Sequence, residues 1–141
     1  MAKLQVELVT AEGRILSEEA DFVLAPGVDG DLGVLPHHIP LLTPLRTGEV
    51  MVRNGDAEHI LFVAGGFLEI LPDKVTILAD AAERAEDIDE ARAEESRKKA
   101  QELLSQDIGN YEASLALERA TLRLRVADVR RRRHGGHPPA Q

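Results

Sequence analysis

The sequence predicts an α+β protein, in which an N-terminal β-sandwich (a flattened barrel) is followed by a C-terminal antiparallel helical hairpin. Two changes near residue 87 indicate this order. Before that point, short apolar segments are broken by glycine and proline; after it, no proline occurs before Pro138 and alanine becomes frequent. The charge changes too, because residues 1–87 carry 6 basic and 16 acidic side chains, whereas residues 88–141 carry 11 basic and 9 acidic ones.

The first part of the chain has the pattern of a series of short strands. From Leu4 to Val9, apolar and polar residues alternate, as in a strand with one buried face. Asn54-Gly55 separates two apolar segments, 50–53 and 59–63, and this pair is preferred in tight hairpin turns. Gly65-Gly66 is expected to end the second of these strands. Short strands at this spacing favour a sandwich or a flattened barrel.

The last part of the chain has the pattern of two helices. Asp87, with Glu90 three residues later, predicts the start of the first helix, and Asp89 is an equally good cap. This helix is expected to run to about Leu104 and the second from about Tyr111 past Val129. An apolar stripe is expected along the second helix at Tyr111, Leu115, Leu122, Val126 and Val129. We therefore expect a sandwich domain at 1–86, a helical domain at 87–133 and a disordered tail at 134–141.

The composition excludes several classes of function. The net charge of −8 and an aromatic content of 3% argue against binding to nucleic acid. No segment reaches the roughly 18 apolar residues of a membrane-spanning helix, and no signal peptide is expected. The sequence has no phosphate-binding loop of the GxxxxGK[ST] type, no nucleophile elbow and no metal-like histidine spacing. The chain is therefore not expected to be an enzyme on its own.

Three features point to binding instead. The first is the stretch 32–42, whose two prolines make a stiff apolar loop that is either a docking surface or a plain crossover between strands. The second is the helix entry 88–93 with Glu83 before it, where Asp89 and Arg92 have the spacing of an ion pair within a helix. The third is a row of arginines on the second helix. These arginines either form a solvated face or bind a carboxylate or phosphate group.

Four motifs in order resemble those of the epsilon subunit of the F-type, proton-translocating ATP synthase. They are Gly30-x-Leu32-Gly33-x-Leu35-Pro36-x-His38-Ile39-Pro40-Leu41, Gly65-Gly66-Phe67-Leu68-Glu69, Asp73-Lys74-Val75-Thr76-Ile77-Leu78 and Ala82-Glu83-Arg84-Ala85-Glu86-Asp87-Ile88-Asp89. The resemblance extends from Leu4 to about Val129, and its predicted layout of strands before helices is the same.

The resemblance implies a noncatalytic subunit of the central stalk, which couples rotation to ATP synthesis. Its sandwich would bind the gamma subunit and the c-ring, and the docking residues implied are Leu32, Leu35, Pro36, His38, Ile39 and Pro40. Its helices would move between a folded and an extended form that reaches the alpha and beta subunits and inhibits ATP hydrolysis. The protein would lie on the cytoplasmic face of a bacterial plasma membrane, held there through the complex alone.

The resemblance also implies a nucleotide site, although no cofactor is required. Some members of the family bind regulatory ATP on the folded hairpin, and the corresponding residues are Glu83, Ile88, Asp89, Arg92, Ala93, Arg119 and Arg123. Lys99 departs from this pattern, because the ATP-binding members have an arginine there. The run Arg130–Arg133 extends beyond the usual family length and is either a solvated end or a contact for an acidic surface. The alternative is a free-standing adaptor that binds an acidic protein.

Overall fold

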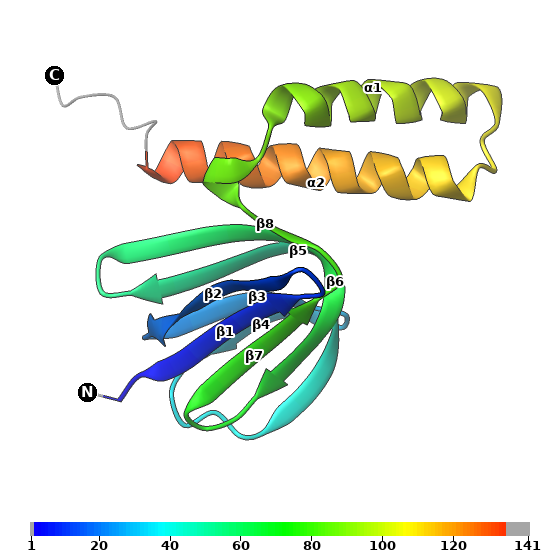
Figure 1. The fold of residues 1–141 in the computed structure, drawn as a ribbon. Helices are drawn as coiled ribbons and strands as arrows, with labels where there is room; N and C mark the ends of the chain where they lie inside the picture. The colour runs from blue at the N-terminus through cyan, green and yellow to red at the C-terminus, as the bar shows by residue number, and fades with distance from the viewer. Residues whose placement is uncertain (1, 135–141) are drawn as a thin grey trace, which may run out of the picture. The chain divides into compact units, whose positions relative to one another are not determined.

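The computed structural model describes residues 2–134 and divides into two compact units, one up to Arg84 and one from Ala85 onward (Figure 1). The first unit contains β1 (Leu4–Thr10), β2 (Gly13–Ala20), β3 (Phe22–Gly27), β4 (Gly30–Val34), β5 (Leu41–Asn54), β6 (Ala57–Ile70), β7 (Lys74–Ala79) and β8 (Ala82–Arg84). The second contains a 3-10 turn, η1 (Ala85–Asp87), and the helices α1 (Glu90–Gln106) and α2 (Tyr111–His134). Of the predicted tail, 135–141 lie outside the described residues, whereas His134 ends α2.

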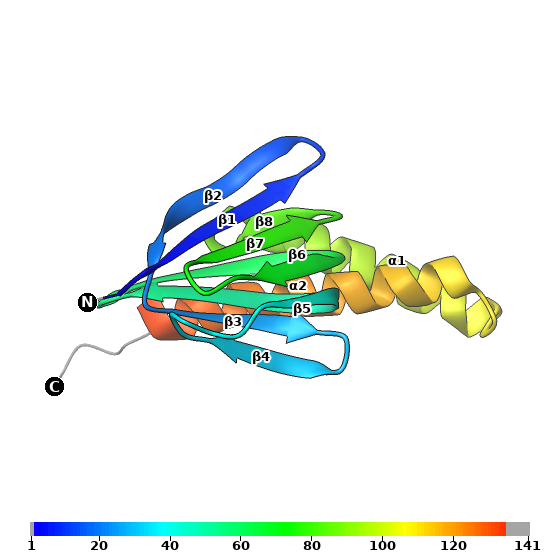
Figure 2. The same cartoon turned by 90° about the horizontal axis from the view of Figure 1, so that it is seen from below.

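The strands form one continuous sheet in the order β2-β1-β7-β6-β5-β3-β4, which Figure 2 shows from below. All neighbouring pairs are antiparallel except β1 and β7, which are parallel. The short strand β8 pairs with β6 beside this path. The predicted class, a β-sandwich followed by two helices, is confirmed.

The core of the sandwich is aliphatic. It contains inward-facing side chains from every strand from β1 to β7, among them Leu4, Leu8, Leu68, Ile70 and Ile77, which are all inaccessible to solvent. The alternation along each strand explains this, because successive side chains point to opposite faces. Among the described residues, no polar or charged residue is buried. The burial of these aliphatic side chains is therefore the main source of stability of the sandwich.

Strand β6 passes through Gly65-Gly66 without a break, contrary to the expected strand end. Both glycines have positive φ, at 93° and 130°, which side-chain-bearing residues rarely adopt. A Cβ on Gly66 would lie 2.0 Å from the carbonyl oxygen of Leu78 on β7. The two glycines thus change the direction of the strand, so that its first half pairs with β8 and its second half with β7.

The hairpin between β5 and β6 is confirmed, but its turn lies one residue later than predicted. Gly55 and Asp56 form the turn, and Asn54 pairs with Ala57 as a strand residue. The Asn54 side chain instead accepts a hydrogen bond from Lys3, which also donates to Asp21. Hydrogen bonds from Lys3 and from the Gly55 N–H hold the pKa of Asp21 below its usual value of 3.8. This network therefore stabilises the fold at neutral pH and is lost as the pH falls through that lowered pKa.

Capping residues set the limits of both helices. Asp89 is the N-cap of α1, because its carboxylate accepts a hydrogen bond from the Arg92 N–H at 3.0 Å, so the second of the two predicted caps is the correct one. The helix ends at Gln106, two residues beyond the prediction. Asn110 caps α2 in the same way through the Ala113 N–H, at 3.0 Å.

Alanines at seven-residue intervals make up most of the buried positions of the two helices. They are Ala93 and Ala100 on α1, and Ala113, Ala120 and Ala127 on α2. Seven residues are close to two helical turns, so each set lies along one face of its helix. The predicted stripe on α2 is wrong at its first member, because Tyr111 is 73% exposed. We call these five residues the alanine seam.

We expect Gly66→Ala to destabilise the protein by about 3 kcal/mol or more, because the new methyl group collides with β7 and φ is unfavourable. Urea unfolding followed by circular dichroism would measure this. Gly55→Asn is the matched control, since φ is 61° and open space surrounds the position. Asparagine tolerates such backbone angles, so a change within about 1 kcal/mol is expected. Equal losses in both variants would contradict this explanation of the β6 bend.

Candidate functional site

The predicted docking residues lie at one end of the sandwich, where β4 leads into β5. The connecting loop, 35–40, is held against the turn between β6 and β7 by a hydrogen bond of 2.7 Å from the His37 N–H to the Pro72 carbonyl oxygen. His37 has a φ of 71°, which helps to close the loop. This end of the sandwich is therefore built from two chain segments far apart in the sequence.

The structure places the six docking residues in different environments. Leu35 and Ile39 are 60% and 77% exposed, and Pro40 is exposed as well. Pro36 and His38 are partly buried. Leu32 packs against the core of the sandwich, so it supports the loop from inside. Leu41, Leu42 and Leu71 are also exposed at this end. We call Leu35, Ile39, Leu41, Leu42 and Leu71 the apolar end.

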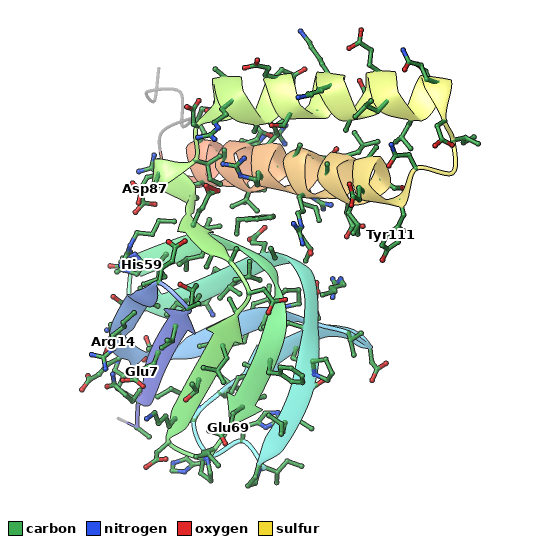
Figure 3. All side chains as sticks on the ribbon, turned by 45° about the vertical axis from the view of Figure 1, so that its right-hand side comes forward. Glu7, Arg14, His59, Glu69, Asp87 and Tyr111 are labelled. Atoms are coloured by element: carbon green, nitrogen blue, oxygen red, sulfur yellow. The ribbon has the colours of Figure 1, made fainter. Side chains whose placement is uncertain are left out.

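The register of the strands brings together a second apolar group that sequence analysis did not identify. Pro44 on β5 is paired with Phe67 on β6, Phe67 with Leu78 on β7, and Leu78 with Val9 on β1. All four lie on the outer face, since their neighbours along each strand point into the core. Phe67 and Leu78 are 52% and 53% exposed. We call this group the apolar row; Glu69, labelled in Figure 3, belongs to the neighbouring row.

Four of the seven predicted nucleotide-binding residues lie at the entry of α1. Ile88 and Ala93 are buried, while Asp89 and Arg92 are exposed. Asp89 bonds to the backbone of Arg92, and this capping bond takes the place of the expected intrahelical ion pair. The guanidinium of Arg92 is thus presented on the surface next to a capped helix N-terminus. Such a terminus favours anions, because its N–H groups and dipole are positive.

The other three predicted residues lie on two different elements. Arg119 and Arg123 lie on α2, one helical turn apart, with Arg119 exposed and Arg123 partly buried. The helices α1 and α2 run antiparallel and side by side (Figure 1). Since Arg92 lies on α1, all three arginines belong to one helical hairpin. Glu83 lies on β8 in the sandwich unit, paired with Phe62. Sequence analysis did not predict this strand.

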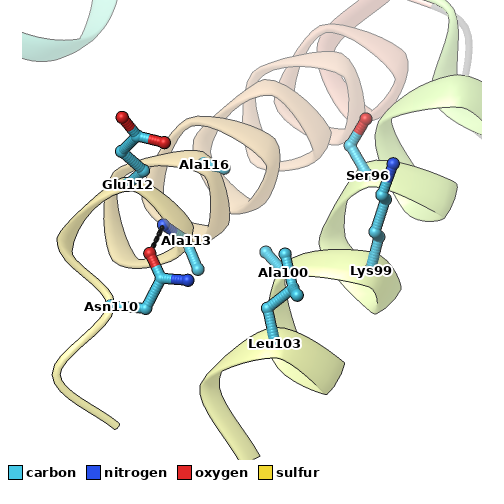
Figure 4. Close-up of a pocket in the computed structure, with 8 residues that line it drawn as sticks. All are labelled: Ser96, Lys99, Ala100, Leu103, Asn110, Glu112, Ala113 and Ala116. Carbon is cyan, nitrogen blue, oxygen red and sulfur yellow. Dashed lines mark hydrogen bonds between the residues drawn. The ribbon is translucent and has the colours of Figure 1, made fainter. Parts of the chain in front are cut away.

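A pocket of about 400 Å³ lies between the two helices near the turn that joins them (Figure 4). Its walls include Ala100, Leu103, Ala113 and Ala116, and Ser96 and Lys99 lie at its edge. None of the seven predicted residues lines it. Lys99, the position that departs from the ATP-binding pattern, is thus a pocket residue with an exposed ammonium group.

The far end of the hairpin is closed by an ion-pair network that includes part of the predicted arginine run. Arg131 donates two hydrogen bonds of 2.8 Å to the Glu90 carboxylate at the start of α1 and one of 3.1 Å to Asp128. These bonds raise the pKa of Arg131 further above its usual range. Arg132 also pairs with Asp128, at 3.0 Å. The run is therefore engaged, in part, within the hairpin.

Two further features are absent from residues 2–134. No group of three or more histidine and acidic side chains is placed to hold a metal ion there. In the same part of the chain, neither helix is apolar enough over a sufficient length to span a membrane. The features that remain are two apolar surfaces and an arginine-bearing hairpin.

Comparisons with known proteins give a consistent result along the chain. The family described as "ATP synthase, Delta/Epsilon chain, beta-sandwich domain" matches residues 3–85. The one described as "ATP synthase, Delta/Epsilon chain, long alpha-helix domain" matches residues 86–128.

Several curated proteins and solved structures are similar over most of their length. The "ATP synthase epsilon chain" of Dehalococcoides mccartyi is 48% identical over 136 residues, which covers 94% of this chain and 97% of the relative. The protein of the same name from Herpetosiphon aurantiacus is 50% identical, with 92% and 98% covered. A chain of the Euglena gracilis mitochondrial ATP synthase OSCP/F1/c-ring structure shares the fold, with a TM-score of 0.70 at 21% identity over 91% of this chain and 79% of that one. A chain of the Tetrahymena thermophila central stalk/c-ring structure has a TM-score of 0.58 at 14% identity, with 90% and 95% covered.

Proposed function

The chain belongs to the ATP synthase delta/epsilon chain family, and on that premise we propose that it is the noncatalytic epsilon subunit of a central stalk. In this role it couples rotation of the rotor to ATP synthesis. The observation that carries the proposal is the match of both family domains, in order, over residues 3–128. The complex lies at a membrane, and the subunit would be peripheral, on the cytoplasmic face of a bacterial plasma membrane.

We propose the gamma subunit and the c-ring as the partners of the sandwich. The similar chains of known structure come from complexes described as F1/c-ring and central stalk/c-ring, which supports this choice. The apolar end and the apolar row support it physically. Contiguous exposed apolar side chains mark an interaction surface, because their burial removes them from water. We propose that the apolar end and the apolar row are the surfaces through which the sandwich binds these two partners.

Phe67→Asp and Leu42→Asp are expected to weaken binding to the gamma subunit and the c-ring by about tenfold or more, because each places a charge in an apolar interface. Both side chains are at least half exposed, so the fold is retained. Affinity purification of the tagged chain from its own membranes would measure the gamma and c subunits recovered.

Ala57→Asp is the control, because Ala57 is exposed and pairs with Asn54 beside the turn between β5 and β6, ten residues along β6 from Phe67. Recovery of these subunits should be unchanged with it. If the wild-type chain is purified without any ATP synthase subunit, the stalk assignment fails and the adaptor hypothesis takes its place.

We propose that the helices regulate ATP hydrolysis by leaving the folded hairpin and reaching the alpha and beta subunits. The alanine seam supports this, since a buried methyl group contributes only about 0.8 kcal/mol, whereas a buried leucine contributes about 1.5–3 kcal/mol. A folded hairpin held by small side chains has alternatives close in free energy, which partners can select.

Deletion of residues 88–141 is therefore expected to raise ATP hydrolysis by the assembled complex several-fold while leaving its assembly intact. The comparison needs equal amounts of complex, checked by the recovery of the gamma and c subunits. Unchanged hydrolysis in a fully assembled complex would remove inhibition from the proposed function.

We propose a regulatory ATP site on the folded hairpin, at the six of the seven predicted residues that belong to the helical unit: Ile88, Asp89, Arg92, Ala93, Arg119 and Arg123. Arg92 and Arg119 support it, because exposed guanidinium groups bind phosphate oxygens in pairs of hydrogen bonds. The capped N-terminus of α1 adds positive potential beside Arg92. Lys99 keeps the charge of the family's arginine but lacks its planar pair of donors, so weak binding is expected.

Millimolar ATP should raise the melting temperature of the isolated chain, because a ligand that binds the folded form alone stabilises it. Arg92→Ala and Arg123→Ala are expected to abolish the shift, while Lys99→Arg should increase it. Arg125→Ala, at an exposed arginine of the same helix outside the motif, is the control. A shift that survives both alanine variants would place the nucleotide elsewhere, and no shift with Lys99→Arg would dismiss the site.

A further inference from the structure

The turn between the two helices is closed by hydrogen bonds of its own residues. The Asp107 carboxylate accepts a hydrogen bond from the Gly109 N–H at 3.1 Å, and the Asp107 carbonyl oxygen accepts one from the Asn110 N–H at 3.1 Å. The Asp107 N–H donates to the Leu103 carbonyl oxygen at 3.0 Å, which continues α1 into the turn. Asn110 in turn caps α2. The four-residue turn 107–110 is therefore fixed at both ends.

This hydrogen-bonded turn and the helix ends beside it present apolar side chains to solvent. Ile108 is 94% exposed, Tyr111 is 73% exposed and Leu103 is 42% exposed. Among the described residues of the helical unit, these three are the large apolar side chains with the greatest exposure, and Figure 3 shows Tyr111 projecting from the start of α2. Exposure of the Ile108 side chain to water is unfavourable. A binding partner that buried this side chain would therefore lower the free energy. We call these three residues the hairpin tip.

The hairpin tip lies beside a hollow. Leu103 also lines the pocket of about 400 Å³ between the helices, together with Ala113 and Ala116 (Figure 4). The Asn110 side-chain oxygen is occupied by its bond to the Ala113 N–H, so the apolar walls dominate this part of the pocket. Exposed apolar side chains beside a pocket give this surface both protruding and concave parts. A partner of complementary shape can therefore bind it specifically.

The charge around the hairpin tip is negative, unlike that of the second half of α2. Residues 100–118 contain Glu102, Asp107, Glu112 and Glu118 and no lysine or arginine. Residues 119–133, in contrast, contain seven arginines and one acidic residue. Glu102, Asp107 and Glu112 are all exposed. Three exposed carboxylates therefore accompany the apolar side chains as an acidic rim, and Lys99 is the one cationic residue among the described residues that line the pocket.

We propose that the hairpin tip is a docking site for a protein whose apolar pocket is rimmed by lysine or arginine side chains. Complementary charge attracts such a partner and excludes others. A second copy of the tip would bring acidic rims together, and an anionic lipid surface would repel the same carboxylates. The proposal requires neither the nucleotide site nor the apolar surfaces of the sandwich.

The experiment places a photo-crosslinking amino acid at position 111 of the full-length chain, expressed at its natural level, and maps the crosslinked peptide by mass spectrometry. The expected peptide combines apolar residues with flanking lysines or arginines. Ile108→Asp and Glu102→Lys should each lower the crosslink yield by about tenfold. Neither endangers the fold, since Ile108 is exposed and a cation at the end of α1 is favourable to the helix dipole.

Two controls separate this surface from the rest of the chain. Val28→Asp adds the same charge at another exposed apolar residue, and Glu95→Lys reverses an exposed charge in the middle of α1, and both should leave the yield unchanged. A crosslink to lipid, to a second copy or to a peptide without basic residues would overturn the proposal, as would a yield that Ile108→Asp does not change. Recovery of the gamma and c subunits, measured on the same samples, reports separately on the stalk assignment.

Discussion

The sandwich buries large apolar side chains, whereas the helices fully bury mainly small ones. The difference in stability that we infer between the two units depends on this contrast. The sandwich is closed by leucine, isoleucine and valine side chains from seven strands, packed without access to solvent. Among the described residues of the two helices, the fully buried side chains are alanines and Val126, and the leucines are only partly buried or exposed. At about 25 cal/mol for each Å² of apolar surface, the same backbone length is anchored much more firmly in the first unit than in the second. From this difference in side-chain size we infer a firm base and a more weakly held hairpin.

The bend of β6 links the stability of the sandwich to its two exposed surfaces. Gly66 approaches the backbone of β7 so closely that no side chain fits, which lets one strand serve two parts of the sheet. Phe67 follows directly and points outward, where strand pairing aligns it with Leu78. The close approach of β7 thus explains why the motif has glycine at position 66. Phe67, the next residue, contributes an exposed apolar side chain. A glycine that the fold requires and an exposed apolar side chain are thus neighbouring residues of one strand.

The strand alternation, the change of period near residue 87 and the capping aspartate were readable from the sequence because each is local. The sequence could not show that β6 continues through Gly65-Gly66, since Gly-Gly is also a common chain break and only the approach of β7 decides between the two. The apolar row escaped detection because it joins four residues from four strands whose register is not local information. For the candidate sites, sequence analysis located the loop at 35–40 and the entry of α1, but assigned Leu32 to the surface although it packs on the core.

Hydrogen exchange of the full-length chain tests the unequal anchoring most directly. Amides in the middle of α1 and α2 should exchange through an opening that leaves the core of β1, β6 and β7 protected, and their protection should therefore be much lower. Deuterium uptake measured peptide by peptide resolves the two units, which divide after Arg84. If the helices and the central strands exchange at the same slow rate, in one cooperative unfolding event, the hairpin is not a separately releasable unit and the account is contradicted.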